Sequence, residues 1–252
     1  MAFVNRRQGL GLLGGLAAFG AGPVKARQAV ESERLTTYST RGHDYPVVIA
    51  PPATVEGEMT GAAIMLLHGS GGLGSEFEMF RRQARRFTAQ GYWVVMPSYF
   101  SDSANPAQTD DVDWWLTAVT DAAVWTAALP GVDPERLGAL GYSRGGYLAG
   151  EAAVQGTTIK AVVGVASAGN VEPGNIVRRP EVLLIHARRD PVIPRERTTR
   201  WARILREHDV PVETVVLPVD RHNFDAEEWD GIFERADGFF RRTLVSPSNL
   251  SS

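Results

Sequence analysis

The feature that most constrains the fold is the five-residue segment 141–145, Gly-Tyr-Ser-Arg-Gly, which follows an apolar run. A helix-like stretch, 147–155, comes next, so the sequence predicts that Ser143 lies on a sharp turn between a strand and a helix, in the G-x-S-x-G pattern of a nucleophile elbow. A serine in such a turn adopts strained backbone angles, and Gly141 and Gly145 remove side chains that would clash with the neighbouring strand or helix. The alternative is an ordinary glycine-rich turn in which Ser143 only caps the helix.

The first 26 residues differ from the rest of the chain. Paired arginines, Arg6 and Arg7, precede an apolar stretch rich in glycine and alanine, 10–22, and small residues follow at 24–26, where a signal peptidase would cut. This pattern resembles a twin-arginine signal peptide, and we expect residues 1–26 to be removed and the protein to be periplasmic or secreted. The apolar stretch is short and glycine-rich for a membrane span. A retained membrane anchor or an amphipathic N-terminal helix is the alternative.

The remainder is expected to form one domain, 27–245, followed by a frayed polar tail, 246–252. A chain of 252 residues with 44% hydrophobic content is long enough to bury one α/β core. The net charge is −3, and removal of the signal would make it more negative because that segment holds basic residues and no acidic ones. Such a domain is a poor candidate for binding nucleic acid or an anionic membrane surface. The chain has no cysteine, which excludes disulfides, thiolate metal sites and cysteine nucleophiles.

Apolar runs of strand length alternate with helix-like segments along the domain. The predicted strands are 34–38, 45–49, 62–67, 92–96, 137–140, 161–165, 182–186 and 213–217. The predicted helices are 76–90, 113–129, 147–155, 194–207 and 227–241. This alternation predicts an α/β fold with a mostly parallel sheet and helices on both faces. In such a sheet, functional loops lie at the carboxyl ends of the strands.

Two further motifs follow predicted strands. Asp190 opens an Asp-Pro-Val-Ile-Pro segment after the strand 182–186, and His222 lies in Arg-His-Asn-Phe after the strand 213–217. A serine hydroxyl becomes a competent nucleophile when a neutral imidazole can take its proton and a carboxylate orients that imidazole. Among the other histidines, we expect His186 to be a packed strand residue. For Asp190 the alternative is an Asp-Pro turn.

From about Arg34 to Arg241 the chain resembles an α/β-hydrolase, and within that superfamily it is most similar to the dienelactone-hydrolase-like group. The resemblance rests on the elbow, the D-x-x-[IV]-P segment and the late H-x-F signature, in that order along the chain. It implies an α/β-hydrolase fold and a catalytic triad made of Ser143, Asp190 and His222.

The segment 68–72, His-Gly-Ser-Gly-Gly, follows the third predicted strand, where this superfamily forms half of its oxyanion hole. The resemblance implies that the donors are the backbone N–H groups of Ser70 and Arg144, with Gly71 as a possible substitute for Ser70. The same glycines also fit a G-x-G-x-x-G dinucleotide fingerprint. However, that fingerprint would follow the first strand, and no clear acidic partner ends the next strand. We therefore expect no cofactor, and no His, Asp or Glu cluster has the spacing of a metal site.

The expected substrate is a small ester or lactone. Dienelactone hydrolases proper use a cysteine nucleophile, so the serine puts a lactone substrate in doubt while leaving ester hydrolysis intact. Arginines that could hold a substrate carboxylate are Arg144, Arg178 and Arg179, and the alternative is that they are solvated surface residues. Aromatic residues that could line a pocket are Tyr99, Phe100, Trp114 and Trp115, and the alternative is ordinary core packing.

The sequence leaves two other functions open, a serine peptidase and a binding module without activity. A dipeptidyl-peptidase-like serine peptidase would share the elbow and the Asp–His order. Peptidases of that type carry a propeller domain, and only about 30 residues precede the core here. A catalytically silent binding module would keep the fold, although the intact Ser143, Asp190 and His222 argue against it. The oligomeric state cannot be predicted from the sequence.

Overall fold

The computed structural model describes residues 33–54, 57–100 and 112–245. Its strands are β1 (Arg34–Thr40), β2 (His43–Ala50), β3 (Ala63–Leu67), β4 (Trp93–Pro97), β5 (Leu137–Tyr142), β6 (Ile159–Val165), β7 (Glu181–Ala187) and β8 (Val212–Leu217). Its helices are α1 (Gly72–Ala89), α2 (Val112–Ala127), α3 (Arg144–Val154), α4 (Arg195–Glu207) and α5 (Ala226–Leu244), with a short 3₁₀ turn, η2 (Pro173–Asn175). The predicted signal peptide, 1–26, and the predicted polar tail, 246–252, lie outside the described residues.

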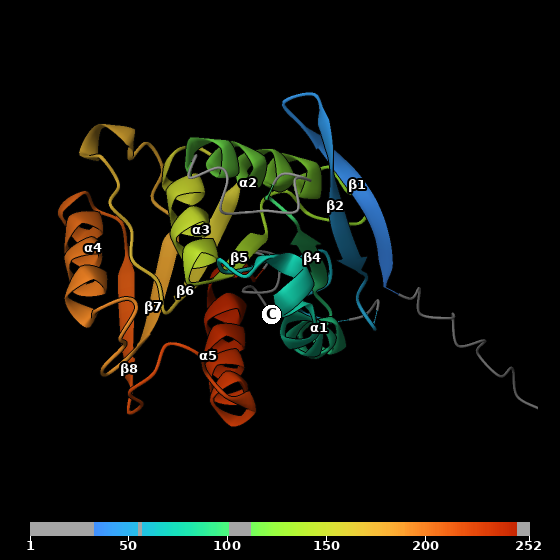
Figure 1. Cartoon of the computed structure of the whole chain (residues 1–252). Coiled ribbons are helices and arrows are strands. Elements are labelled where there is room, and N and C mark those ends of the chain that lie inside the picture. Colours follow the sequence, from blue (N-terminus) through green and yellow to red (C-terminus); the bar gives the residue numbers. More distant parts are fainter. Residues whose placement is uncertain (1–32, 55–56, 101–111, 246–252) are drawn as a thin grey trace, which may run out of the picture.

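The eight strands form one sheet in the order β1-β2-β4-β3-β5-β6-β7-β8 (Figure 1). The strands β1 and β2 form an antiparallel hairpin, and β2 runs antiparallel to β4. All other pairs are parallel. The predicted mostly parallel α/β fold is therefore confirmed.

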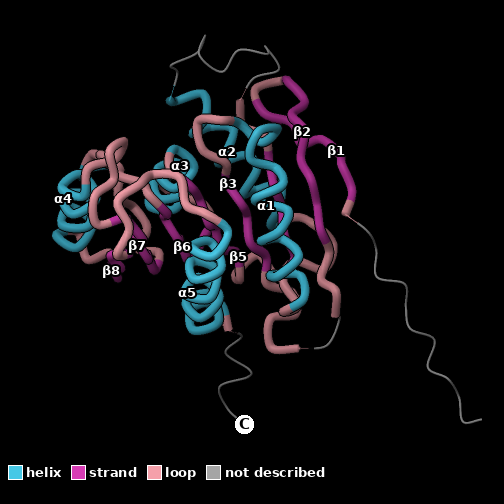
Figure 2. Tube along the Cα trace, turned by 60° about the horizontal axis from the view of Figure 1, so that its bottom comes forward, coloured by secondary structure: helices cyan, strands magenta, loops and turns pink. Residues whose placement is uncertain are grey.

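Helices cover both faces of the sheet and bury a separate core on each. One core is formed with α2, α3 and α4, and the other with α1 and α5 (Figures 1 and 2). Successive side chains of a strand point to opposite faces. In β3, Met65 packs in the first core and Leu66 in the second. A strand buried on both sides needs apolar residues throughout, which explains the continuous apolar run that predicted β3.

Two helices begin about one turn earlier than predicted. Helix α1 begins at Gly72 and α3 at Arg144, so each helix starts directly after the loop that carries a candidate functional residue. Because β3 and β5 are parallel neighbours, these two helix starts lie at the same edge of the sheet.

Within the described ranges, no helix is both long enough and apolar enough to cross a bilayer.

Candidate functional site

Ser143 lies on the turn between β5 and α3, with a φ of 52° and a ψ of −114°. Its flanking glycines allow this turn to fit against neighbouring backbone. A Cβ on Gly141 would lie 2.2 Å from the carbonyl carbon of Gly145, and a Cβ on Gly145 would lie 2.1 Å from the carbonyl oxygen of Leu67. The backbone N–H of Ser143 donates a 2.8 Å hydrogen bond to Val165 of β6, which anchors the turn to the sheet. The sharp strand-to-helix turn predicted from the glycine spacing is present.

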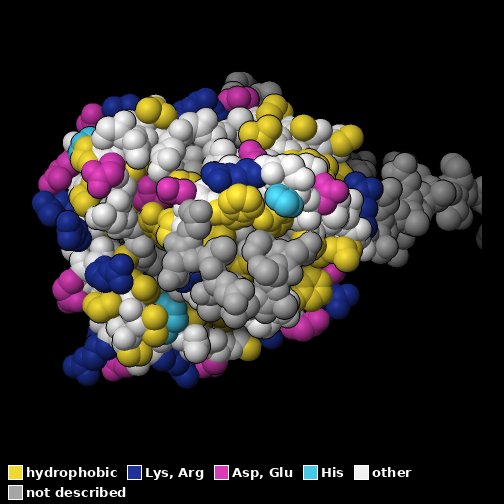
Figure 3. Space-filling view, turned by 45° about the horizontal axis from the view of Figure 1, so that its top comes forward, with side chains coloured by type: hydrophobic (Ala, Val, Ile, Leu, Met, Phe, Trp, Pro, Cys, Tyr) yellow, Lys and Arg dark blue, Asp and Glu magenta, His cyan; other side chains and the backbone are white. Residues whose placement is uncertain are grey.

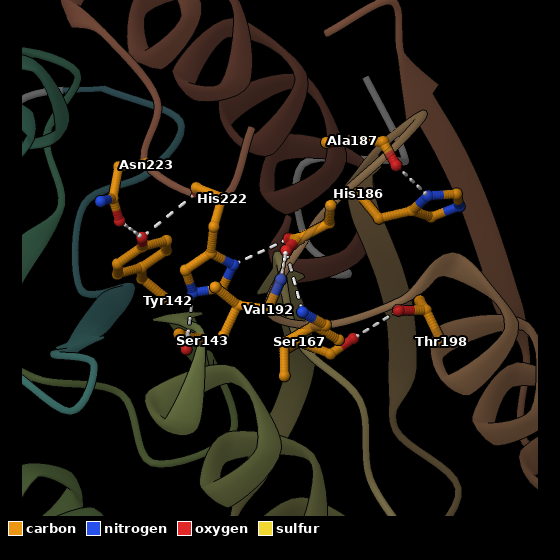
Figure 4. A network of polar contacts seen from close by, with 11 residues as sticks. Tyr142, Ser143, Ser167, His186, Ala187, Val192, Thr198, His222 and Asn223 are labelled. Atoms are coloured by element: carbon orange, nitrogen blue, oxygen red, sulfur yellow. Dashed lines mark hydrogen bonds and ion pairs between the residues drawn. The ribbon is translucent and has the colours of Figure 1, made fainter. Parts of the chain in front are cut away.

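Ser143, His222 and Asp190 form a continuous hydrogen-bonded chain (Figure 4). Nε2 of His222 lies 3.0 Å from Oγ of Ser143, and Nδ1 of His222 lies 2.7 Å from Oδ2 of Asp190. The three residues follow β5, β7 and β8, whose carboxyl ends meet at one edge of the sheet. The arrangement can pass the serine proton to the imidazole while the carboxylate faces the opposite ring nitrogen.

The Asp190 carboxylate is buried, with a side chain only 1% exposed. Its Oδ1 accepts hydrogen bonds from the backbone N–H groups of Val192 and Ile193, each 2.8 Å long. These bonds compensate for the loss of water around the charge and leave Oδ2 directed at His222. The Asp-Pro-Val-Ile-Pro segment thus forms a turn around its own aspartate, so the turn and a role in orienting the histidine are compatible.

The loop after β3 approaches the elbow with its backbone N–H groups. Gly71, a possible substitute donor by sequence, is engaged with the side chain of Glu76 at 3.3 Å. Among the described residues, none accepts a hydrogen bond from the N–H of Ser70 or of Arg144. Within the described part of the chain, the two N–H groups predicted to face an oxyanion thus have no acceptor, whereas that of Gly71 is occupied. Glu76 cannot be singled out from the sequence, because its partners are backbone groups that no motif reveals.

Arg144, the residue after the serine, packs on aromatic rings. Its guanidinium carbon lies 4.2 Å from the ring centroid of Trp115 and 6.0 Å from that of Phe100. Trp115 is buried in the core, with 1% exposure. A cation above an aromatic face is held by the negative quadrupole of the ring. These contacts hold the Arg144 side chain against the two rings, and the choice between core packing and pocket wall resolves to core packing for Trp115.

Two aromatic residues predicted as possible pocket wall differ in burial, since Tyr99 is a core residue whereas Trp114 is only half-buried. Tyr99 is fully buried, and its ring stacks on that of His68 with 3.9 Å between centroids. Its hydroxyl donates a hydrogen bond to the carbonyl oxygen of His68, so Tyr99 helps to hold the start of the loop after β3. Trp114 donates from its ring nitrogen to the hydroxyl of Tyr45 on β2, at 2.7 Å. Full burial makes Tyr99 a packing residue, and a place in the pocket wall stays a prediction for Trp114.

The structure places Arg178 and Arg179 away from Ser143, as the alternative of solvated surface residues expects. The N–H of Arg178 donates to the carbonyl of Val154, at the end of α3 opposite to the serine. Arg179 is exposed, 4.0 Å from Asp209. A connection between parallel strands must return to the amino edge of the sheet before the next strand begins. Both arginines directly precede β7 and therefore lie at that far edge.

Two other histidines are packed residues. Burial lowers the pKa of His68 to about 4 and also lowers that of His186. The Nδ1 of His186 lies 3.1 Å from the carbonyl oxygen of Ala187, which agrees with its prediction as a packed strand residue. Among the described residues, no group of three His, Asp or Glu side chains is arranged to hold a metal ion.

On the face shown in Figure 3, basic and acidic side chains are interspersed.

An eight-stranded, mostly parallel sheet with Ser143 at the β5–α3 turn, and with His222 and Asp190 after later strands, defines an α/β-hydrolase fold. The family model of the dienelactone hydrolase family matches residues 47–237, and the chain belongs to this family of hydrolases. A comparison with curated protein sequences finds no match.

Solved structures of α/β-hydrolases resemble this chain in fold. Esterase 2 of Thermogutta terrifontis is 19% identical, with a TM-score of 0.69 over 86% of this chain and 97% of its own. The carboxylesterase EstE1 from a metagenomic library is 16% identical, with a TM-score of 0.70 over 86% of this chain and 90% of its own. A Klebsiella pneumoniae protein assigned as a dienelactone hydrolase is 20% identical, with a TM-score of 0.68 over 82% of this chain and 97% of its own.

Proposed function

We propose that this hydrolase cleaves small carboxylic esters or lactones through an acyl-enzyme formed on Ser143. The observation that carries the proposal is the hydrogen-bonded chain from Ser143 through His222 to the buried Asp190. A serine hydroxyl gains nucleophilic reactivity when an oriented imidazole lies within hydrogen-bond distance of it. Membership of the dienelactone hydrolase family points to the same bond class.

In the first half of the reaction, Oγ of Ser143 attacks the carbonyl carbon as its proton passes to Nε2 of His222. The carbonyl oxygen becomes an oxyanion, which the N–H groups of Ser70 and Arg144 stabilise. Asp190 stabilises the imidazolium through Nδ1. The imidazolium then protonates the leaving alkoxide, the carbon–oxygen bond breaks, and the acyl group remains on the serine.

In the second half, a water molecule attacks the acyl-enzyme while Nε2 of His222 takes its proton. A second oxyanion forms in the same place and collapses, so the carboxylic acid leaves and the proton returns to Oγ of Ser143. With a lactone, the leaving alcohol remains tethered to the acyl group, and a single hydroxy acid is released. The chain's own residues suffice for every step.

Solved structures of one similar esterase support a small acyl group. Structures of Thermogutta terrifontis esterase 2 contain propionate or butyrate, and another has the enzyme phosphorylated by paraoxon. We infer short acyl chains here by analogy with that enzyme.

We also propose that the protein acts outside the cytoplasm, because Arg6 and Arg7 precede a signal-like apolar stretch.

The decisive experiment combines a substrate panel with active-site labelling. Purified protein should hydrolyse p-nitrophenyl esters of graded chain length, and aryl esters and lactones assayed alongside define the preference. A fluorophosphonate probe should label Ser143 alone, and Ser143→Ala should lose both turnover and labelling while keeping its thermal stability. Ser39→Ala, which changes an exposed serine on β1, serves as the control and should keep both. Labelling that persists in Ser143→Ala would refute the proposal.

A further inference from the structure

Glu76, in the first turns of α1, binds the backbone of the loop that follows β3. Its Oε2 accepts a 2.6 Å hydrogen bond from the N–H of Gly69, and its Oε1 accepts a 3.3 Å hydrogen bond from the N–H of Gly71. One carboxylate therefore holds the loop at two points. Those two points are the immediate neighbours of Ser70 on either side.

This double contact decides which N–H of the loop is left for a ligand. Alternate N–H groups, those of Gly69 and Gly71, point to the carboxylate. The N–H between them, that of Ser70, has no acceptor among the described residues, and Ser70 is exposed. An anion-binding N–H must be aimed before the charge develops, because reorientation during the reaction would cost free energy. By binding the N–H groups of Gly69 and Gly71, Glu76 can fix the direction of the Ser70 N–H before the reaction begins.

The geometry leaves little room for the loop to shift. A Cβ on Gly71 would lie 2.9 Å from Oε1 of Glu76, and a Cβ on Gly69 would lie 3.0 Å from the same atom. The Gly69 Cβ would also lie 3.1 Å from the ring of Tyr142, which adjoins the nucleophile. Glycines at both positions thus allow the loop to lie against Glu76 on one side and the elbow on the other.

Glu76 is also electrostatically linked to the histidine. The half-buried position of Glu76 raises the pKa of its carboxyl, and the two loop N–H groups and the charge of His222 lower it. The Glu76 carboxylate is thus one of the charges near the proposed base. The described groups that feel this charge are His222, Tyr142 and Tyr99.

We propose that Glu76 is a positioning residue that holds the loop 69–71 so that the N–H of Ser70 faces the developing oxyanion. This inference rests on the proposed esterase function and adds to it a residue outside the triad. It explains why the donor is Ser70 and not Gly71, whose N–H the same carboxylate occupies.

The test compares Glu76→Gln with Glu78→Gln, which makes the same change two residues further along α1. The Glu78 side chain is 82% exposed, and its only described partner is Arg81 at 3.7 Å. The amide of Glu76→Gln keeps one acceptor oxygen for the loop. Its NH₂ group would face the second loop N–H, and because two donors repel each other, the loop would shift. We expect kcat to fall roughly 10- to 100-fold with little change in KM, since the loop acts on the transition state. Glu78→Gln should match the wild type.

The inhibition constant of a trifluoromethyl ketone distinguishes a positioning residue from one that only stabilises the fold, because the latter would leave this constant unchanged. The ketone's adduct with Ser143 carries an oxyanion, so its inhibition constant should rise by the same factor as kcat/KM falls. If Glu76→Gln proves unstable on thermal unfolding, Glu76→Asp, which keeps the charge but shortens the side chain, should also lower kcat and weaken the ketone.

The inference is overturned if Glu76→Gln keeps the wild-type kcat and ketone affinity, or if only KM changes. Failure of the proposed function gives a different result. In that case the wild type itself would neither turn over esters nor be labelled at Ser143. An active wild type with an equally active Glu76→Gln variant would refute only the positioning role.

Discussion

The hydroxyl of Tyr142 donates a 2.7 Å hydrogen bond to the side-chain oxygen of Asn223 (Figure 4). Tyr142 directly precedes Ser143, and Asn223 directly follows His222. The same hydroxyl lies 3.3 Å from the carbonyl oxygen of His222. The loop that carries the proposed base is therefore tied to the elbow that carries the proposed nucleophile, and this contact helps to hold the two side chains 3.0 Å apart.

Tyr142→Phe should lower kcat by roughly tenfold with KM nearly unchanged, because the His222 loop loses its link to the elbow. The ring should keep its edge contact with Trp229, whose centroid lies 5.6 Å away, so the fold should persist. Steady-state kinetics and circular dichroism measure the two effects. Tyr92→Phe is the matched control, because it removes a buried hydroxyl at the amino edge of the sheet and should leave kcat unchanged.

Asp190→Asn should lower kcat by about 10⁴-fold, the loss typical of triads that lose this charge. The two N–H donors at Oδ1 would hold the amide oxygen in place, so its NH₂ group would point at His222 and favour the wrong tautomer. Single-turnover and steady-state assays measure the loss. Asp220→Asn changes an exposed aspartate paired with Arg188 and should be silent. An Asp190→Asn variant within tenfold of the wild type would contradict the assignment.

Gly145→Ala should destabilise the protein by about 3 kcal/mol or more, or prevent folding. The new Cβ would lie 2.1 Å from the backbone oxygen of Leu67 and 2.5 Å from that of His68, and backbone cannot move aside cheaply. Urea denaturation measures the change in the free energy of unfolding. Gly74→Ala, within α1, meets nothing within 4 Å and should not destabilise, since alanine favours a helix over glycine. Equal stabilities for the two variants would refute the crowding argument.

Glu151, in the middle of α3, should make stability depend on pH. Burial raises the pKa of its carboxyl from 4.5 to about 7, so the folded state binds the proton more tightly than the unfolded state. Stability should therefore fall as pH rises from about 4.5 to 7 and stay lower above that range. Glu151→Gln removes this penalty, so its midpoint of thermal unfolding should exceed that of the wild type by roughly 5 °C at pH 8 and by much less at pH 4.5. A gap independent of pH would contradict this reasoning.

Export should depend on the paired arginines. Replacing Arg6 and Arg7 with lysine keeps the charge and the apolar stretch, yet it removes the pair that the twin-arginine machinery reads. We expect precursor to accumulate in the cytoplasm, whereas the exported wild type should begin near Arg27 by intact-mass analysis. Normal export of the double-lysine variant would point to a general secretory signal or an anchor instead.

Much of the fold and of the candidate site could be predicted because the signals are local. The apolar run that became β3 and the alternation of strands with helices identify the layers, since burial on both faces demands apolar residues throughout. The glycines around Ser143 identify the turn, because their crowding involves backbone within a few residues and the neighbouring strand. Asp190 and His222 could be proposed because each follows a predicted strand and matches a motif of the α/β-hydrolases that the chain resembles.

Contacts between side chains far apart in the sequence depend on tertiary packing. This packing brought Asn223 to Tyr142, tied Glu76 to the loop 69–71, and placed Arg178 at the edge remote from Ser143. These outcomes depend on the direction in which a loop leaves a strand and on which helix face turns inward. Neither depends on a residue pattern that a single sequence displays. Residue patterns thus specified the layers of the sheet and pointed to the three residues at its edge, while packing determined what holds those residues within hydrogen-bond distance.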